Sequence, residues 1–217
     1  MVPAPLQPPF VDPAPYAQAY ESALDPQLRA FHAKDRPEIR LALRPARLGD
    51  GDALQNYVRA LSPESRYNRF LGAVNELPAS ELARALTANG RDTLTLLLTS
   101  TSEERETVVG EARVALSCVE RAGEFAMSIA DDWRGLGLGS ALHEAVERKA
   151  AADGIERLFG DVLRTNDVMI AFALSRGFRL AAGLEPRVVR IEKRLEAASD
   201  LPCRKWAEIA GAEIGAA

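Results

Sequence analysis

A cluster of glycines between a predicted strand and a predicted helix constrains the fold more than any other part of the chain. The segment 125–140 reads FAMSIADDWRGLGLGS, so apolar residues lead into a loop in which Gly135, Gly137 and Gly139 alternate with other residues. Glycine lets the backbone turn its amide groups toward one point. The start of the following helix adds about half a positive charge there. The segment therefore predicts an anion site suited to a phosphate group.

Three phosphate-binding patterns place glycines in such a loop. A nucleoside-triphosphate P-loop needs a lysine after its last glycine, and none follows Gly139, which excludes that pattern. A dinucleotide-binding loop needs a glycine at the sixth position, where this chain has Ser140 or Leu142. The third pattern is Arg or Gln, two residues, and then Gly-x-Gly or Gly-x-Ala, and the residues from Arg134 to Gly139 match it in full. The alternative is a flexible connection between strand and helix that holds no ligand.

In this setting the loop resembles the one with which the GNAT (GCN5-related) N-acetyltransferases hold the pyrophosphate of acetyl-CoA. A second match follows downstream, where the segment 162–169 (VLRTNDVM) leads into 174–178 (LSRGF). It is similar to the family's strand that ends in Asn, followed by a helix that closes with Gly-Phe. The resemblance covers about residues 38–196. It implies an α/β fold of the α+β type: a GNAT-like mixed, mostly antiparallel central sheet, flanked by helices, with splayed central strands.

The spacing of apolar residues predicts the order of the elements. Helical spacing, with Ser62-Pro63 and Leu77-Pro78 as starts, predicts three helices between residues 50 and 90. Two further helices are predicted at 140–153 and 166–176, and a hairpin turn at Gly123. Alternating apolar residues predict strands at 39–44, 93–99, 108–119, 124–130, 155–163, 178–182 and 188–195. The successive strands between 93 and 130 lie so close along the chain that they must pair antiparallel.

Proline is concentrated at the start of the chain. Six of the 13 prolines lie within the first fifteen residues, and proline favours extended backbone because it cannot donate a backbone hydrogen bond. We therefore expect a proline-rich N-terminal arm with a short helix over residues 1–37, a GNAT domain over 38–196 and a C-terminal tail over 197–217. The tail carries Trp206 and Ile209 among small residues. It would pack either locally or on a second subunit of a homodimer.

Composition and charge exclude several classes of partner. The net charge is -4 and the pI about 5.4, whereas nucleic-acid binding rests on a basic surface, so no nucleic-acid partner is expected. The two cysteines, Cys118 and Cys203, and the two histidines show no metal-ligand spacing, so no metal is expected. No window approaches the ~20 apolar residues of a membrane-spanning helix, and the N-terminus lacks a signal-peptide pattern. We expect a cytoplasmic protein that does not bind a membrane.

The resemblance to GNAT enzymes implies acetyl-CoA as co-substrate and assigns residues to it. Arg134 and the backbone amides of the glycine loop would hold the pyrophosphate. Backbone groups of Met127, Ser128 and Ile129 would bind the pantetheine arm, with the Met127 and Ile129 side chains in the core, and Asn166 would lie beside the pantetheine or the thiol. The residues of the loop are Gly135, Leu136, Gly137, Leu138, Gly139 and Ser140. Asn is also a favoured helix cap, and the two roles of Asn166 can coexist.

Acetyl transfer to an amine needs a base, because the exposed amine of a lysine has a pKa of about 10.4 and carries a proton. In the lysine acetyltransferases that this chain resembles, a glutamate at the start of the strand before the glycine loop is the base, and Glu124 holds that position. Glu111 on the preceding strand is the alternative base, or it pairs with Arg113. Many family members place a tyrosine that protonates the thiolate where this chain has Ala173, which leaves that step to solvent or another group. His143 is expected on the surface of its helix.

The predicted reaction is transfer of an acetyl group from acetyl-CoA to a primary amine by direct attack. The segment 61–70 (LSPESRYNRF) is similar to the GNAT domain of bacterial protein lysine acetyltransferases. A protein lysine is therefore the preferred acceptor, and a small polyamine or an aminoglycoside is the alternative acceptor. From another functional class, a non-catalytic module that binds or senses acyl-CoA would keep the loop and have no need of Glu124.

Overall fold

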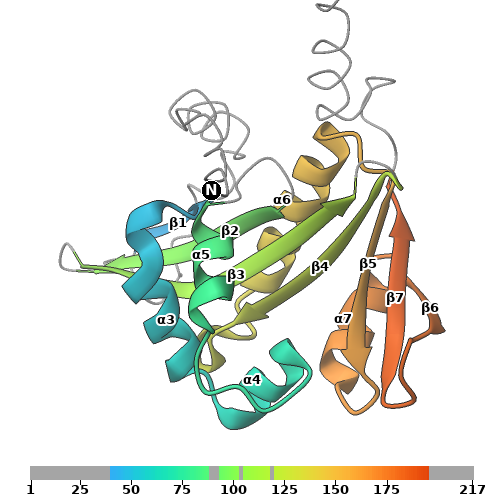
Figure 1. Ribbon diagram of the computed structural model, residues 1–217, viewed down its shortest axis with the longest axis horizontal. Helices are drawn as coiled ribbons and strands as arrows, with labels where there is room; N and C mark the ends of the chain where they lie inside the picture. The colour runs from blue at the N-terminus through green and yellow to red at the C-terminus, as the bar shows by residue number, and fades with distance from the viewer. Residues whose placement is uncertain (1–39, 88–92, 103–104, 118–119, 196–217) are drawn as a thin grey trace, which may run out of the picture.

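A seven-stranded sheet with helices on both faces forms the body of the protein (Figure 1). The computed structural model describes residues 40–87, 93–102, 105–117 and 120–195. The predicted arm at 1–37 and the predicted tail at 197–217 lie outside the described residues, and so do Cys118 and Cys203. The strand order is β1-β2-β3-β4-β5-β7-β6, and β4 and β5 form the one parallel pair within this sheet. This arrangement confirms the mixed, mostly antiparallel sheet.

The first four strands form an antiparallel meander. They are β1 (Arg40–Pro45), β2 (Thr93–Ser102), β3 (Arg105–Ser117) and β4 (Ala122–Ile129). The turn expected at Gly123 is wrong, because Gly123 is buried inside β4 and pairs with Leu116. A Cβ there would lie 2.9 Å from Val114 Cγ1, so close packing explains this glycine. Arg121 has the left-handed backbone, with φ of 46°.

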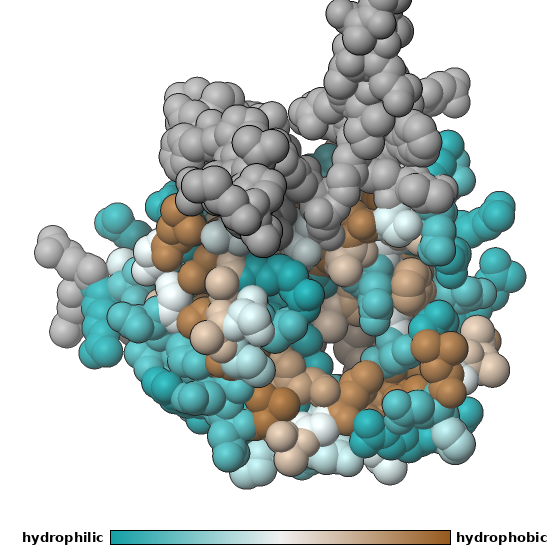
Figure 2. All heavy atoms as spheres, viewed as in Figure 1, coloured by the Kyte–Doolittle hydropathy of each residue, from teal (hydrophilic) through white to brown (hydrophobic). Residues whose placement is uncertain are grey.

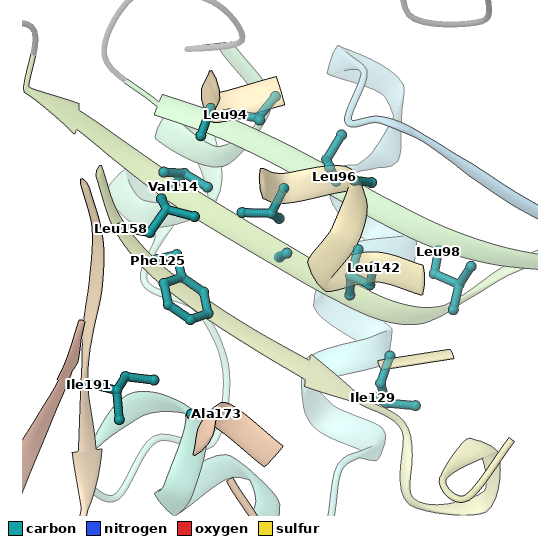
Figure 3. Close-up of a cluster of buried hydrophobic side chains, with 14 of the residues drawn as sticks. Leu94, Leu96, Leu98, Val114, Phe125, Ile129, Leu142, Leu158, Ala173 and Ile191 are labelled. Atoms are coloured by element: carbon teal, nitrogen blue, oxygen red, sulfur yellow. The ribbon is translucent and has the colours of Figure 1, made fainter. Parts of the chain in front are cut away.

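Three helices cover one face of this meander, and one long helix covers the other. On the first face lie α3 (Gly51–Ala60), α4 (Pro63–Phe70) and α5 (Ala79–Thr87), with the short turn η1 (Leu48–Asp50) before them. On the second face α6 (Leu138–Ala152) packs on β2, β3 and β4. Figure 3 shows the core on this second face, where Leu142 of α6 meets Leu98 and Ile129 of the strands.

Local sequence sets the start of α4 but not that of α3. The Ser62 side chain caps α4 by accepting a hydrogen bond from the Ser65 amide, as the Ser-Pro start predicts. Asp50 precedes α3 but does not cap it with its side chain. Its carboxylate instead accepts two hydrogen bonds, of 2.7 and 2.8 Å, from the guanidinium of Arg44.

The central strands β4 and β5 separate after a short paired region. Strand β5 (Arg157–Leu163) pairs with β4 at three positions, which end at Glu124 opposite Phe159. Beyond them the two strands diverge, as Figure 1 shows. The sheet thus forms a V with two arms. One arm is the meander β1–β4. The other arm consists of β5, β7 (Val188–Arg194), β6 (Arg179–Ala182) and α7 (Asp167–Ser175). The splayed central strands predicted from the family resemblance are confirmed.

Candidate functional site

The glycine loop presents unpaired backbone amides at the start of α6. Strand β4 ends in the turn η2 (Asp131–Trp133), and the loop follows with left-handed backbone at Gly135 (φ 75°) and Gly137 (φ 78°). Within the described residues, no amide from Gly135 to Gly139 donates to a backbone carbonyl. Gly135 is exposed, and a Cβ there would meet nothing within 4 Å. Free amides, an exposed loop and a helix start together fit a diphosphate.

The side chains of two residues in the predicted phosphate site, Arg134 and Ser140, contact other parts of the protein. Arg134 lies toward α4, where its Nη2 donates to Ser65 Oγ at 2.8 Å and its Nη1 lies 3.2 Å from Asp131 Oδ1. The hydroxyl of Ser140 accepts a hydrogen bond from Arg176 of the α7 C-terminus. The backbone amides of the loop are thus the groups that this structure leaves open to an anion.

The edge of β4 that faces β5 is unpaired over the predicted pantetheine-binding residues. Met127 and Ile129 turn their side chains toward the core under α6, as expected. Ser128 faces the opposite side of the sheet, where its Oγ lies 2.8 Å from the hydroxyl of Tyr57. Because β4 pairs with β5 only as far as Glu124, backbone groups beyond that point lack a strand partner on the β5 side. Such groups can bind the amides of an extended ligand.

Asn166 lies just after β5, at the start of α7. Its Oδ1 accepts a hydrogen bond of 3.1 Å from the amide of Met169, so the helix-cap interpretation is confirmed. The residue stands on the β5 arm of the V, opposite the arm that carries the glycine loop. Its position is compatible with the additional role beside the cofactor.

Glu124 is exposed at the last paired position before the strands diverge. Its neighbour Phe125 points into the core under α6, so the Glu124 side chain lies on the opposite face, where α3, α4 and α5 pack. No ion pair or hydrogen bond of its side chain occurs within the described ranges. Arg190 lies near enough that its pKa, raised chiefly by its hydrogen bonds to Asp161, is raised a little further by the charge of Glu124. Figure 2 shows the surface hollowed between the two arms of the V.

Glu111 is buried completely and bound to two arginines. Arg69 Nη2 of α4 lies 2.8 Å from one carboxylate oxygen, and Arg113 Nε lies 2.8 Å from the other. Burial alone would raise the pKa of Glu111, but the charges of Arg69 and Arg113 outweigh it and lower the pKa. The structure therefore favours the predicted pairing with Arg113 over the role of base. Glu124 is the carboxylate that solvent reaches.

Two features of the site were missed or wrong in the sequence prediction. Tyr57 was not singled out, yet its hydroxyl binds Ser128, and burial together with the negative charge of Glu111 raises its pKa. His143 is not on the surface: it is fully buried and meets the edges of Phe125, Phe172 and Phe178. The helical spacing of Tyr57 with Leu54 and Leu61 does place it on the buried side of its helix, but gives no sign of the contact with Ser128. Ala173 is buried in the core, with no hydroxyl in its place.

Burial of His143 predicts a pH dependence of stability. Both ring nitrogens lack a hydrogen-bond partner, and burial lowers the pKa of this histidine despite Glu147, whose Oε1 lies 3.7 Å from Nε2. The native state then keeps His143 neutral. The contribution of His143 to the free energy of unfolding is therefore fully present above the unfolded pKa of about 6.5 and falls as pH drops below it. We expect the free energy of unfolding to fall by up to ~1.4 kcal/mol per pH unit between pH 6.5 and the lowered native pKa.

Urea unfolding of the wild type and of His143→Phe at pH 5 to 8 checks this expectation. The phenylalanine variant keeps an aromatic ring in the cluster and loses the titration. Equal pH slopes for the two proteins between pH 5 and 6.5 would show that His143 does not titrate differently on folding.

The comparisons with known proteins agree with this geometry. The sequence model of the Acetyltransferase (GNAT) family matches residues 64–178, which is more than half of the chain. The chain belongs to the GNAT acetyltransferase family. This GNAT protein is therefore an acetyl-CoA-dependent N-acetyltransferase, and acetyl-CoA is its co-substrate, as predicted.

Three similar proteins illustrate the match. Acetyltransferase PA5475 of Pseudomonas aeruginosa is 30% identical over 138 residues, which cover 63% of this chain and 73% of that protein. The GNAT domain of S. lividans PAT has a TM-score of 0.64 and 26% identity, over 70% of this chain and 89% of that one. Spermidine N-acetyltransferase from Vibrio cholerae, solved with CoA and spermine, has a TM-score of 0.59 at 15% identity, over 72% of this chain and 96% of that one. The last comparison shows a shared fold.

The described part of the chain contains neither a candidate membrane-spanning helix nor a candidate metal site. No helix in these ranges has the length and apolar character needed to cross a membrane. No group of three or more His, Cys, Asp or Glu side chains among the described residues could hold a metal ion.

Proposed function

We propose that this GNAT enzyme acetylates the side-chain amine of a protein lysine, with Glu124 as the base. The observation that carries the proposal is the arrangement around the V. Unpaired amides of the glycine loop lie at the end of β4, an unpaired strand edge leads back from them, and an exposed carboxylate stands where β4 and β5 meet. One strand thus carries an anion site at one end and a proton acceptor at the other.

Each part of this arrangement has a chemical role in acetyl transfer. Acetyl-CoA, when bound, supplies the acetyl group and a sulfur leaving group. The loop amides would bind its diphosphate, and the free edge of β4 would align the chain that follows. Glu124 would accept the proton that the amine loses as its nitrogen bonds to the carbonyl carbon. Solvent would protonate the departing sulfur, because Ala173 offers no hydroxyl.

A protein lysine is preferred as the acceptor for two reasons. The segment 61–70 resembles bacterial protein lysine acetyltransferases, and the structure forms α4 from it, beside β4 and on the same face as Glu124. The similarity to the S. lividans PAT domain, at 26% identity, points the same way. A polyamine is the second acceptor class, since the fold is shared with a spermidine N-acetyltransferase.

Thiol release from acetyl-CoA across a panel of amines tests the proposed activity. The panel holds lysine-containing peptides, spermidine and an aminoglycoside. We expect release with peptides, and none when their lysines are replaced by glutamine. Release with spermidine alone would move the assignment to the second acceptor class. Calorimetric binding of acetyl-CoA with no release on any amine would support the alternative of a non-catalytic sensor.

Replacing Gly137 with valine should weaken CoA binding at the loop. Gly137 has φ of 78°, a backbone conformation that a β-branched residue avoids. The variant would turn the loop and redirect its amides, so we expect the Kd for CoA to rise by at least about tenfold. Calorimetry with CoA measures the change. Gly49→Val is the matched control, because Gly49 lies in an exposed turn with no atom within 4 Å of a Cβ. Unchanged CoA affinity in Gly137→Val would remove the loop from the proposed site.

A further inference from the structure

Helix α4 is held in place by polar contacts. Its sequence PESRYNRF contributes one buried residue, and that residue is Ser65. Helices in globular proteins are ordinarily fixed by an apolar stripe that faces the core. In this segment Phe70 packs at the edge of the core, and Ser62, Ser65 and Arg69 add polar contacts to the cofactor loop and to β3. These polar contacts tie α4 to segments far away in the sequence.

The Ser65 hydroxyl joins two charged residues of the cofactor loop to this helix. Its Oγ donates to Asp131 Oδ1 at 2.6 Å and accepts from Arg134 Nη2 at 2.8 Å. The hydroxyl of Ser62 lies 2.6 Å away on the same helix start. The Ser62 hydroxyl also donates to Asp131 Oδ1, at 3.2 Å, so both serines bind the same carboxylate. We call Ser62, Ser65, Asp131 and Arg134 the Ser65 clamp.

Asp131 completes the clamp from the other side. It accepts a hydrogen bond of 2.9 Å from the Ser62 amide in addition to the one from Ser65. Burial would raise the pKa of Asp131, but these hydrogen bonds and the charge of Arg134 lower it, so the carboxylate is ionised at neutral pH. A carboxylate at the start of α4 is also stabilised by the helix dipole. The start of α4 is thus capped by a residue 69 positions later in the chain.

The clamp connects the two functional sides of the enzyme. Arg134 directly precedes Gly135 and Asp131 lies four residues before it, so their positions fix where the glycine loop begins. On the other side, α4 contacts β4, and the hydroxyl of Tyr67 lies 3.5 Å from Nη1 of Arg187, which belongs to the loop between β6 and β7. Helix α4 therefore reaches from β4 to the arm of the V that carries β6 and β7.

We propose that Ser65 is a positioning residue that fixes the cofactor loop and helix α4 together. By orienting Arg134, which also pairs with Asp131, it sets the loop for the diphosphate, and by the same contacts it holds α4 beside the end of β4. This inference rests on the proposed cofactor site. The Ser65 hydroxyl would thus fix the conformation of the cofactor loop without contacting the ligand itself.

A double-mutant cycle with CoA as the probe tests this role without knowledge of the acceptor. Calorimetry measures the Kd of CoA for the full-length wild type, Ser65→Ala, Arg134→Gln and the double variant. We expect Ser65→Ala to weaken binding by about tenfold, the size of one hydrogen bond to a charged group. Arg134→Gln should weaken binding as well, and adding Ser65→Ala to it should cause no further loss, because Ser65 acts through Arg134. Ser65→Thr keeps the hydroxyl and should bind CoA like the wild type.

Hydrogen exchange of residues 61–71 supplies a second readout that a purely structural role would not move. CoA binding should slow exchange in α4 of the wild type and of Ser65→Thr, and should leave it unchanged in Ser65→Ala. Ser80→Ala, at an exposed serine of α5, is the control and should match the wild type in both experiments.

The outcomes separate this inference from the proposed function. Normal CoA binding by Ser65→Ala, or additive losses in the cycle, overturns the positioning role. Loss in Ser65→Ala that Ser65→Thr does not restore also overturns it, since the hydroxyl would then not be the cause. Normal CoA binding by Arg134→Gln would overturn the predicted part of Arg134 in the cofactor site, and with it the route through which Ser65 acts. The loop amides are tested separately by Gly137→Val.

Discussion

Glu124→Gln is expected to lower kcat/KM for amine acetylation by about 10²- to 10⁴-fold while CoA binds with unchanged affinity. The physical reason is the loss of the exposed carboxylate at the meeting point of β4 and β5, since general-base catalysis contributes rate factors of this size. Glutamine keeps the shape of the side chain and cannot take the proton. Because Glu124 is exposed and makes no ion pair within the described residues, folding should be unaffected.

The measurement is thiol release with the best amine of the panel, together with calorimetry for CoA. Glu192→Gln serves as the control, since Glu192 of β7 pairs with Phe159 in the register that also joins Phe159 to Glu124. It removes a carboxylate from the same row of the sheet, two strands away from Glu124. Undiminished turnover by Glu124→Gln would show that another group takes the proton. An equal loss of turnover in Glu124→Gln and Glu192→Gln would indicate that the loss of negative charge, and not the loss of a base, lowers the rate.

Removal of the buried carboxylate of Glu111 is the change with the largest expected effect on stability. Glu111→Gln leaves two arginines, Arg69 and Arg113, in a buried site without a counter-charge. Breaking a buried ion pair on one side costs about 3–5 kcal/mol in comparable cases. We therefore expect the free energy of unfolding to fall by about that amount at pH 7. The exposed Arg59–Glu76 pair offers the control, because Glu76→Gln should cost less than about 1 kcal/mol.

Urea unfolding of both variants at several pH values measures the size of the stability loss and the direction in which it changes with pH. The lowered pKa of Glu111 means that its contribution is present above the unfolded value near 4.5 and is lost as pH falls through the native pKa. The difference in free energy of unfolding between the wild type and Glu111→Gln should therefore become smaller at acidic pH. Replacing Arg69, Glu111 and Arg113 together with methionine should recover part of the lost stability, since this variant has no uncompensated buried charges. A small, pH-independent cost of Glu111→Gln would contradict the ionic account.

Local sequence predicted the elements whose cause is local. Ser62 caps α4 and Asn166 caps α7 because a side-chain oxygen satisfies an amide only a few residues away. The glycine loop was identified for the same reason, since left-handed backbone at Gly135 and Gly137 belongs to the loop itself. Family resemblance then supplied the mixed, mostly antiparallel sheet and the splayed strands, which periodicity alone does not give. Gly123 was misplaced because its small size serves packing against Val114 and Leu158, which come from other strands.

Contacts between distant segments decided the rest. The alternating pattern of β3 cannot tell whether Glu111 faces solvent or a second layer of helices, and only the packing of α4 brings Arg69 to it. His143 looked like a surface residue until α7 and β4 enclosed its ring. Arg134 was expected over the glycine loop, and its guanidinium instead contacts Ser65, 69 positions earlier. The chain thus determined by itself the glycine loop, the helix caps and which segments are helix or strand, because those depend on neighbours in sequence. Which charges are buried, and which carboxylate meets solvent, was decided only when both faces of the sheet were covered, because burial depends on segments that fold from elsewhere.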